Sequence, residues 1–556
     1  MNTTHAERII LIGPPGSGKT TIAARVAVLL GWSWVDLDGL IANAEERDIP
    51  TIFAEDGEER FRDLEATALR GALHNRRLVL ATGGGIGERA ENLTLLREAG
   101  WVVSLSARPE TALERMRREL ERQGKEPGET RPLLAGDDPL ARLYALSEQR
   151  HSWYARADDV IVTDEWDEMT VARRIVAGLA GRGLLAGEGA EPVTRQVTTG
   201  AGQAYDAVVA WGGLATLPRR LQELRLPPRL HVVADANVAA LYEPALMAGL
   251  VAAGFDPLVY RVPAGESSKS REQLAAIHDW LAERRAERGE AVVVLGGGVV
   301  GDLAGFAAAT YLRGVPLVHI PTSLLAQVDA SIGGKVAINH PRGKNLIGAF
   351  YQPRLVLSDP AALLTMPQRE RVEGWAEVIK HGVALDAEYF ARIERDAEAL
   401  LALRPAETTA AIAGSVALKA GIVEGDERER EGGRRHLLNY GHTIGHAIEA
   451  VAGYGAWLHG EAVAVGMMVA ARVGQRLGVT PSDVVERQDA LLRRLGLPVE
   501  LRGLSADELM RAALWDKKLS SGRVRWVLPT TLGQASLYDD APNEVVREAL
   551  VACGAE

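Results

Sequence analysis

Hydrophobic and polar positions divide the chain into regions with different periods. Up to about residue 180, short apolar runs such as residues 8–12 and 159–163 alternate with stretches of helical period. Strands separated by helices usually pair in parallel, so this alternation predicts a parallel sheet with helices on both faces. The same alternation returns between about 205 and 360, whereas residues 361–519 are almost entirely helical in period. An α/β protein that ends in a helical domain is therefore expected.

A glycine-rich segment separates the first region from the rest. Residues 181–192 contain four glycines and one proline and show no sustained period, as a flexible linker would. The predicted domains are residues 1–180, 193–360 and 361–556, with the linker between the first two. Because the linker reads as a tether, each half is expected to fold and work alone.

A phosphate-binding loop follows the first apolar run. Residues 13–20 match the full pattern GxxxxGK(S/T) between a strand and a helix. In that pattern backbone amides surround phosphates, the lysine reaches the terminal phosphates and the hydroxyl binds Mg²⁺. The sequence therefore predicts ATP and Mg²⁺ as ligands, with the nucleotide held by Gly13, Gly16, Ser17, Gly18, Lys19 and Thr20.

The rest of the first region carries further motifs. They are Asp36-Leu37-Asp38, residues 57–65, Ala81-Thr82-Gly83-Gly84-Gly85, Arg131-Pro132-Leu133-Leu134 and Arg150 before Trp153-Tyr154. Together with the phosphate loop they resemble the shikimate kinase family. The resemblance implies a P-loop kinase domain that transfers a phosphoryl group from ATP to shikimate, giving shikimate 3-phosphate.

The kinase resemblance assigns the acceptor side of the reaction to four residues. It implies that Asp38 orients or deprotonates the attacking hydroxyl. The residues implied to hold shikimate are Arg62, Gly84 and Arg150, with both guanidinium groups on its carboxylate. Glu65 lies three residues after Arg62, so it either fixes that guanidinium or forms a simple surface ion pair with it.

The resemblance also assigns the phosphoryl side. Lys19 and Arg131 would stabilise the group in transfer, a reaction that depends mainly on positioning and charge neutralisation. Residues 124–130 have the composition of a mobile lid that would deliver Arg131 and exclude water. The Mg²⁺ candidates are Thr20 and Asp36.

A second glycine-rich turn stands in the middle of the chain. Residues 296–302, Gly-Gly-Gly-Val-Val-Gly-Asp, follow the apolar run 291–295 and precede a helix of small residues, so backbone amides could approach a pyrophosphate. The usual dinucleotide fingerprint has an acidic residue about 20 positions later, where this chain has Pro321 and Thr322. An ordinary dehydrogenase is therefore disfavoured, and another acidic residue must hold the ribose.

Three residues further on form a candidate metal site. Two imidazoles and a carboxylate, from His442, His459 and Glu377, can fill three corners of a zinc site and leave the fourth for water or substrate. The alternative is that these are helix-start and core residues. His446 is a competing ligand because it lies four residues after His442 on the same helix face.

The second half resembles the 3-dehydroquinate synthase family over roughly residues 191–556. The motifs that carry this resemblance are residues 296–302, 327–335, 343–345, 377–380, 441–446 and 459–461. It implies conversion of 3-deoxy-D-arabino-heptulosonate 7-phosphate to 3-dehydroquinate with loss of phosphate. The implied cofactors are NAD⁺, which is reduced and then reoxidised within one turnover, and Zn²⁺ or Co²⁺. Relatives that make other cyclitols from sugar phosphates share many of these motifs.

The same resemblance supplies the implied site residues. The metal ligands are Glu377, His442 and His459, and His446 is placed at the substrate phosphate. The substrate positions are Arg313, Asp329, Lys335, Asn345, Lys380, Lys419, Arg435, Asn439, His446 and Lys517, of which Lys335, Lys380, Lys419 and His446 are the catalytic candidates. The NAD positions are Asp235, Asn237, Glu266, Lys269, Gly297, Gly298, Asp302, Thr322, Ser323 and Lys344, with Asp235 on the ribose.

Two positions depart from the synthase pattern. Val336 stands where threonine is frequent, and residues 428–431 make the segment two residues longer than in the family. The acidic residue expected in that segment is therefore either Glu431 or Glu429.

Composition limits the partners and the compartment. The chain has 556 residues and a formal net charge of −11, which argues against nucleic acid and acidic membranes and for small-molecule substrates. Its single cysteine excludes a disulfide framework within the chain, and neither an apolar signal core nor a run of eighteen apolar residues is found. A cytoplasmic enzyme is expected, with a homodimer through the synthase half as the one protein partner considered.

The interpretation that the sequence favours is a fusion of the two enzymes. Two alternatives stay open: the second half is a related cyclase that acts on another sugar phosphate, or the first half is a non-catalytic ATP-binding regulatory module.

Overall fold

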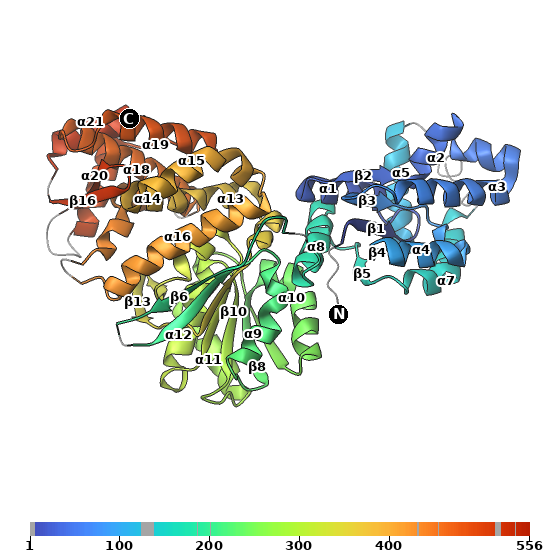
Figure 1. Cartoon of the computed structure of the whole chain (residues 1–556), viewed down its shortest axis with the longest axis horizontal. Coiled ribbons are helices and arrows are strands. Elements are labelled where there is room, and N and C mark those ends of the chain that lie inside the picture. The colour runs from blue at the N-terminus through green and yellow to red at the C-terminus, as the bar shows by residue number, and fades with distance from the viewer. Residues whose placement is uncertain are drawn as a thin grey trace. The chain divides into compact units, whose positions relative to one another are not determined.

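The computed structural model describes residues 6–556 except 124–137, 186, 201, 431–432, 454, 518–523 and 540. The chain folds into two compact units (Figure 1). Unit 1 comprises Met1–Leu179 and residues 184–186, and unit 2 comprises Ala180–Gly183 and Gly187–Glu556.

Unit 1 is built on a five-stranded sheet with the order β2-β3-β1-β4-β5, and every neighbouring pair is parallel. The strands are β1 (Arg8–Ile12), β2 (Ser33–Asp36), β3 (Leu78–Ala81), β4 (Trp101–Ser106) and β5 (Asp159–Val162). The helices are α1 (Lys19–Leu30), α2 (Leu37–Glu45), α3 (Ile49–Ala72), α4 (Ala90–Ala99), α5 (Pro109–Gln123), α7 (Pro139–Tyr154) and α8 (Glu168–Gly181). The predicted parallel α/β fold is confirmed.

The central strand β1 positions the phosphate loop. Residues 9–12 are buried, as expected for a strand covered on both faces. At its carboxyl end Gly13 has φ 143°, and Gly18, with φ 91°, precedes the first turn of α1. Since the carboxyl ends of parallel strands share one sheet edge, the residues that follow β1, β2 and β3 gather there.

The first part of unit 2 contains a seven-stranded sheet with the order β6-β7-β14-β11-β10-β8-β9. Its strands are β6 (Val193–Thr198), β7 (Ala204–Val209), β8 (Arg229–Asp235), β9 (Asp256–Val262), β10 (Ala291–Gly296), β11 (Leu317–Pro321) and β14 (Leu355–Ser358). All neighbours are parallel except β6 and β7. The accompanying helices are α9 (Leu217–Glu223), α10 (Ala236–Ala252), α11 (Arg271–Glu283) and α12 (Gly298–Thr310). A separate antiparallel hairpin, β12 (Lys335–His340) and β13 (Gly343–Phe350), packs against α12.

The second part of unit 2 is helical, as predicted. Its helices are α13 (Gln368–Glu373), α14 (Trp375–Leu385), α15 (Ala387–Leu401), α16 (Pro405–Gly425), α17 (His442–Ala452), α18 (His459–Arg476), α19 (Ser482–Arg494), α20 (Ala506–Lys517) and α21 (Asn543–Ala552). A hairpin of β15 (Arg525–Thr531) and β16 (Gln534–Asp539) lies among them and was not predicted. Among the described helices, α16 is long and apolar enough to cross a membrane, but 61% of that apolar window is buried inside the molecule.

Close contact between α17 and α18 sets the positions of three histidines. A Cβ atom on Gly466 of α18 would lie 2.0 Å from the carbonyl oxygen of Gly441, so the two backbones touch there. Gly441 itself has φ 82°, which favours glycine. This contact fixes the start of α17, with His442 and His446, beside α18, whose first residue is His459.

The Gly466 contact gives the first prediction. Gly466→Ala in the full chain should lower the free energy of unfolding of unit 2 by about 1–3 kcal/mol, because the added methyl group forces the helices apart. Gly421→Ala is the matched control: Gly421 also lies within a helix, and a Cβ added there would have no neighbour within 4 Å, so that change should be neutral or slightly stabilising. Urea unfolding measures both, and equal stabilities of the two variants would contradict the contact.

Candidate functional sites

The predicted metal ligands converge in unit 2. Glu377, in the first turn of α14, is fully buried, and His442 and His459 are the first residues of α17 and α18. Oε1 of Glu377 lies 3.7 Å from Nε2 of His442 and 3.8 Å from Nε2 of His459. The three candidate ligand atoms lie within 4.8 Å of one another.

The hydrogen bonds on the far sides of the rings show which atoms face the centre. Nδ1 of His442 lies 3.2 Å from the carbonyl oxygen of Tyr440, and Nδ1 of His459 lies 3.4 Å from Oε2 of Glu449. Each Nδ1–H donates to an oxygen, so each Nε2 presents a lone pair to the centre. Within the described residues Oε1 of Glu377 accepts no hydrogen bond. Three facing lone pairs repel one another unless a cation lies between them, so the residues fit a zinc ion that keeps one open position.

Charge and burial keep one of the two histidines, His442, in the form that binds a metal. Lys380 forms an ion pair with Glu377. Burial, together with the charge of Lys380, holds the pKa of His442 well below its usual range, so the ring stays neutral. A neutral imidazole is the form that binds a metal.

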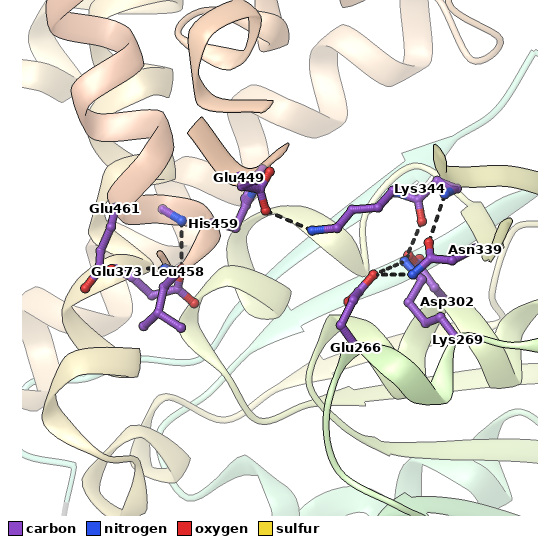
Figure 2. Close-up of polar contacts among 12 residues, drawn as sticks. Glu266, Lys269, Asp302, Asn339, Lys344, Glu373, Glu449, Leu458, His459 and Glu461 are labelled. Carbon is purple, nitrogen blue, oxygen red and sulfur yellow. Dashed lines mark hydrogen bonds and ion pairs between the residues drawn. The ribbon is translucent and has the colours of Figure 1, made fainter. Parts of the chain in front are cut away.

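Three carboxylates that sequence reasoning missed support the centre. Glu449 bonds His459 and also accepts from Nζ of Lys344 at 2.9 Å (Figure 2). Glu373 accepts from the backbone N–H of Gly460 at 2.7 Å, and Glu461 accepts from the N–H of Leu458 at 3.0 Å, so both hold the start of α18. Two of the three had a signal in the sequence: Glu449 lies seven residues after His442 on the same helix face, and Glu461 ends the motif 459–461.

The competing ligand lies next to the centre. The ring of His446 is exposed, and its centroid lies 5.4 Å from that of His442 and 6.1 Å from that of His459. His446, Glu449 and His459 form a second group whose ligand atoms lie within 4.8 Å. That group is the weaker candidate for a metal site, because Glu449 already accepts hydrogen bonds from Nζ of Lys344 and from Nδ1–H of His459.

Several predicted substrate residues adjoin the metal ligands: Lys380 pairs with Glu377, and Asp329 and Glu377 belong to one group of candidate ligand atoms within 4.8 Å of one another. Lys419 donates to the carbonyl oxygen of Asp329 at 2.6 Å and to its Oδ1 at 2.7 Å. Burial lowers the pKa of Lys419 to about 8, and Asp329 opposes that shift. Lys335 forms an ion pair with Glu429, and Asn439 donates to Glu429 at 3.0 Å.

The remaining residues that were predicted to bind substrate do not all lie in this cluster. Arg435 donates to the carbonyl oxygen of Gly333 at 3.2 Å, beside Lys335 in the chain. Glu429, the rival to Glu431, belongs to this cluster, whereas Glu431 and the side chain of Lys517 lie outside the described part of the chain. Arg313 is exposed on the turn before β11, and within the described residues no hydrogen bond or ion pair joins it to the cluster.

The predicted NAD residues lie at the carboxyl edge of the seven-stranded sheet. Gly296, Gly297, Gly298, Gly301, Pro321 and Ala330 line a cavity there. A Cβ on Gly296, where φ is 149°, would lie 3.0 Å from that of Asp235, so the glycine turn adjoins the carboxylate expected to hold the ribose. Asp235 also caps α10 by accepting from the N–H of Asn237 at 2.9 Å. Thr322 and Ser323 follow β11, next to Gly297.

A polar network extends this edge (Figure 2). Nζ of Lys269 donates to Asp302 at 2.7 Å and to Asn345 at 2.5 Å, and Asn339 donates to Glu266 at 2.7 Å. Asn345, assigned to substrate from the sequence, therefore contacts a cofactor-side residue. Asn339 was missed, since its role depends on the register of the β12–β13 hairpin.

The phosphate loop of unit 1 has the form that its pattern predicts. Nζ of Lys19 donates to the carbonyl oxygens of Gly13 and Pro14, both at 2.9 Å. A Cβ on Gly16 would lie 2.5 Å from the carbonyl oxygen of Ala112, so only glycine fits there. Thr20 donates to Asp36, which brings the two Mg²⁺ candidates together.

The acceptor side of unit 1 contains two buried arginines. Arg62, on α3, forms ion pairs with Glu58 at 2.9 Å, Glu65 at 3.0 Å and Glu88 at 3.1 Å. Arg150, on α7, pairs with Glu88 at 2.8 Å. Burial raises the pKa of Glu65 to about 7 against the pull of Arg62, so this pair is part of the interior and not a surface ion pair.

The other acceptor residues stand around these arginines. A Cβ on Gly83 would lie 2.7 Å from Oδ1 of Asp38, and a Cβ on Gly84 would lie 3.5 Å from Nη1 of Arg150, so the glycine run brings both groups close. Tyr154 donates to the carbonyl oxygen of Gly84 at 2.8 Å. Arg131 and the predicted lid, 124–130, lie outside the described residues.

The families that this chain matches correspond to its two units. Residues 259–373 and 374–519 match the N-terminal and C-terminal 3-dehydroquinate synthase families, and residues 15–180 match the shikimate kinase family. A 3-dehydroquinate synthase of Desulforamulus reducens is 46% identical over 348 residues, which cover 62% of this chain and 96% of that protein.

Two solved structures resemble unit 2. A 2-epi-5-epi-valiolone synthase from Streptomyces hygroscopicus subsp. jinggangensis, with NAD⁺ and Zn²⁺ bound, is 29% identical with a TM-score of 0.59, covering 63% of this chain and 96% of that chain. A 2-deoxy-scyllo-inosose synthase complexed with carbaglucose-6-phosphate, NAD⁺ and Co²⁺ is 25% identical with a TM-score of 0.59, covering 65% of this chain and 100% of that chain.

The geometry of the three histidines gives a second prediction. His459→Ala should lose most of the bound zinc, because it removes one of three protein ligands, whereas His446→Ala should keep about one zinc per chain. Elemental analysis of the dialysed full-length variants measures this. Zinc lost from the His446 variant and kept in the His459 variant would reverse the assignment.

Proposed function

The chain belongs to the 3-dehydroquinate synthase family and carries a shikimate kinase domain before it, and we propose that it catalyses both reactions. Unit 1 would phosphorylate shikimate with ATP and Mg²⁺. Unit 2 would convert 3-deoxy-D-arabino-heptulosonate 7-phosphate to 3-dehydroquinate and phosphate. The observation that carries the proposal is the convergence of Glu377, His442 and His459 beside a cluster of cations and a glycine turn suited to a dinucleotide.

The side chains of unit 2 suit a substrate that carries a phosphate and a ring-forming ketone. Lys335, Lys380, Lys419 and Arg435 supply positive charge. All of them except Lys335 are buried, and buried cations bind dianions strongly. Zinc held by the three ligands would polarise an alcohol oxygen, and NAD⁺ on the glycine turn would accept the hydride. His446 stands beside the centre, where it can hold or move a proton at the departing phosphate.

The side chains of unit 1 suit phosphoryl transfer to an anionic alcohol. Backbone amides of the loop and Lys19 hold the nucleotide, and the Thr20–Asp36 pair stands where Mg²⁺ is bound in such loops. Asp38 orients the acceptor hydroxyl, while Arg62 and Arg150 bind the carboxylate of the acceptor.

A related cyclase activity is the second candidate, because the two solved neighbours are named for other products. The identities favour the first candidate: 46% to the 3-dehydroquinate synthase of Desulforamulus reducens, against 29% and 25% to those neighbours. A cytoplasmic location remains our expectation, as does a homodimer through unit 2.

Assays of the purified full chain test the proposal. We expect phosphate release from the heptulosonate phosphate but not from a hexose phosphate, and ATP-dependent phosphorylation of shikimate. Lys19→Met should lower the kinase activity at least about 100-fold and leave the synthase unchanged, because it removes a charge that stabilises the transition state in one unit only. Glu377→Gln, the reciprocal control, should abolish the synthase alone.

A negative result in either assay would lead to a different conclusion about the unit concerned. Turnover of the hexose phosphate in place of the heptulosonate phosphate would make unit 2 a different cyclase. ATP binding without shikimate phosphorylation would make unit 1 a regulatory module.

A further inference from the structure

One carboxylate in unit 1 bridges the two arginines that the proposed function assigns to the acceptor. Glu88 ends the short 3-10 turn Ile86–Glu88. Its Oε2 lies 3.1 Å from Nε of Arg62, and its Oε1 lies 2.8 Å from Nη2 of Arg150. Both oxygens of one carboxylate are therefore engaged by two cations from different helices, as the carboxylate of a bound acid would be.

The glycines of the turn allow Glu88 to reach this place. A Cβ on Gly85 would lie 2.5 Å from Nη2 of Arg62, and a Cβ on Gly87 would lie 2.8 Å from the ring of Trp153. The backbone of the turn thus packs directly on the guanidinium of Arg62 and on the indole below Arg150. A side chain at either position would have to displace the guanidinium of Arg62 or the indole of Trp153, so the two glycines allow this approach.

Glu88 differs from the other carboxylates around Arg62. The side chain of Glu65 is 1% exposed, so it is a fixed part of the interior. Glu58 is 47% exposed and pairs with Arg62 alone among the described contacts. Glu88, at 27% exposure, is the member of this group that touches both arginines and still reaches solvent.

The burial of the two guanidinium groups explains why a carboxylate is needed beside them. Their side chains are only 7% and 3% exposed, for Arg62 and Arg150 respectively. Arg62 also pairs with Glu58 and Glu65, but Glu88 is the ion-pair partner of Arg150 among the described residues, and a buried cation without a carboxylate would be costly. A carboxylate on a mobile side chain compensates both guanidinium groups and can leave when another carboxylate arrives. The exchange keeps the charge of the pocket unchanged.

We propose that Glu88 occupies the place of the acceptor carboxylate and is displaced by it, so that Glu88 sets how tightly the kinase binds its acceptor. This inference rests on the proposed function of unit 1. An acceptor with a carboxylate replaces the contacts that it breaks, whereas a cyclic alcohol without one leaves Glu88 in place and gains nothing from the arginines. Glu88 therefore lowers the affinity for a carboxylate acceptor, because it competes with that acceptor for the same two guanidinium groups.

The test is the steady-state kinetics of full-length Glu88→Gln. The KM for shikimate should fall on the order of tenfold, because the acceptor no longer displaces a charged competitor. The kcat and the KM for ATP should stay within about twofold of wild type, since Glu88 contacts neither nucleotide residue nor Asp38 in the described part of the chain. Glu58→Gln is the matched control, because it removes a carboxylate from Arg62 but none from Arg150, and its KM for shikimate should stay within about twofold.

A second measurement applies even if that variant folds poorly. Glu88→Asp keeps the charge but is one methylene shorter, so it cannot span both guanidinium groups, and its KM for shikimate should also fall. Benzoate, a carboxylate without the reacting hydroxyl, should inhibit both Glu88 variants more strongly than wild type.

The outcomes separate this inference from the proposed function. A KM for shikimate that rises or stays constant in both Glu88 variants overturns the inference, since Glu88 would then position the arginines or be irrelevant to them. Arg62→Lys tests the pocket itself: it should raise the KM for shikimate far more than that for ATP, because the bidentate fork is lost. An unchanged KM for shikimate in Arg62→Lys would overturn the acceptor pocket of the proposed function, whatever Glu88 does.

Discussion

The buried carboxylate of Glu377 is the constraint on which unit 2 depends. A carboxylate with no exposed surface is stable only where compensating charge is built around it. Lys380 supplies one positive charge from the next turn of the same helix, but the lone pairs of His442 and His459 still face its second oxygen. The close α17–α18 packing, the carboxylates that hold the start of α18 and the tautomers of both rings all maintain an arrangement that a divalent cation completes.

A related feature recurs in both units: cations assigned to ligands are already paired with carboxylates of the chain. In unit 2, Lys335 pairs with Glu429, Lys344 with Glu449, and Lys419 with Asp329. In unit 1, Arg62 and Arg150 share Glu88. Such pairing compensates the charge of those cations that lie in the interior, where an unpaired charge would be costly.

Much of the fold could be predicted because its elements are long and strongly periodic. The parallel sheet of unit 1 follows from the alternation of strand and helix periods before residue 180, and the helical end of unit 2 follows from the change of period near residue 361. The hairpins β12–β13 and β15–β16 were not recognised as pairs, because a short apolar run does not reveal which strand it will meet.

The residues of a candidate site could be predicted where one local motif contains them, as in the phosphate loop. They were harder to predict where the packing of distant elements brings them together. Glu88 and Glu373 act through elements far apart in sequence, so neither stands in a recognisable motif. The contact between Asn345 and Lys269 was not predictable from a motif, because Asn345 lies on β13 and its position depends on the pairing with β12.

X-ray absorption at the zinc edge tests the central claim about Glu377, His442 and His459 most directly. The full-length zinc-loaded protein should show a four-coordinate metal with two imidazole ligands and scattering from light oxygen neighbours, one of them a carboxylate. Three imidazole ligands would bring His446 into the metal site, and none would remove the metal from this cluster. Either result would contradict the account.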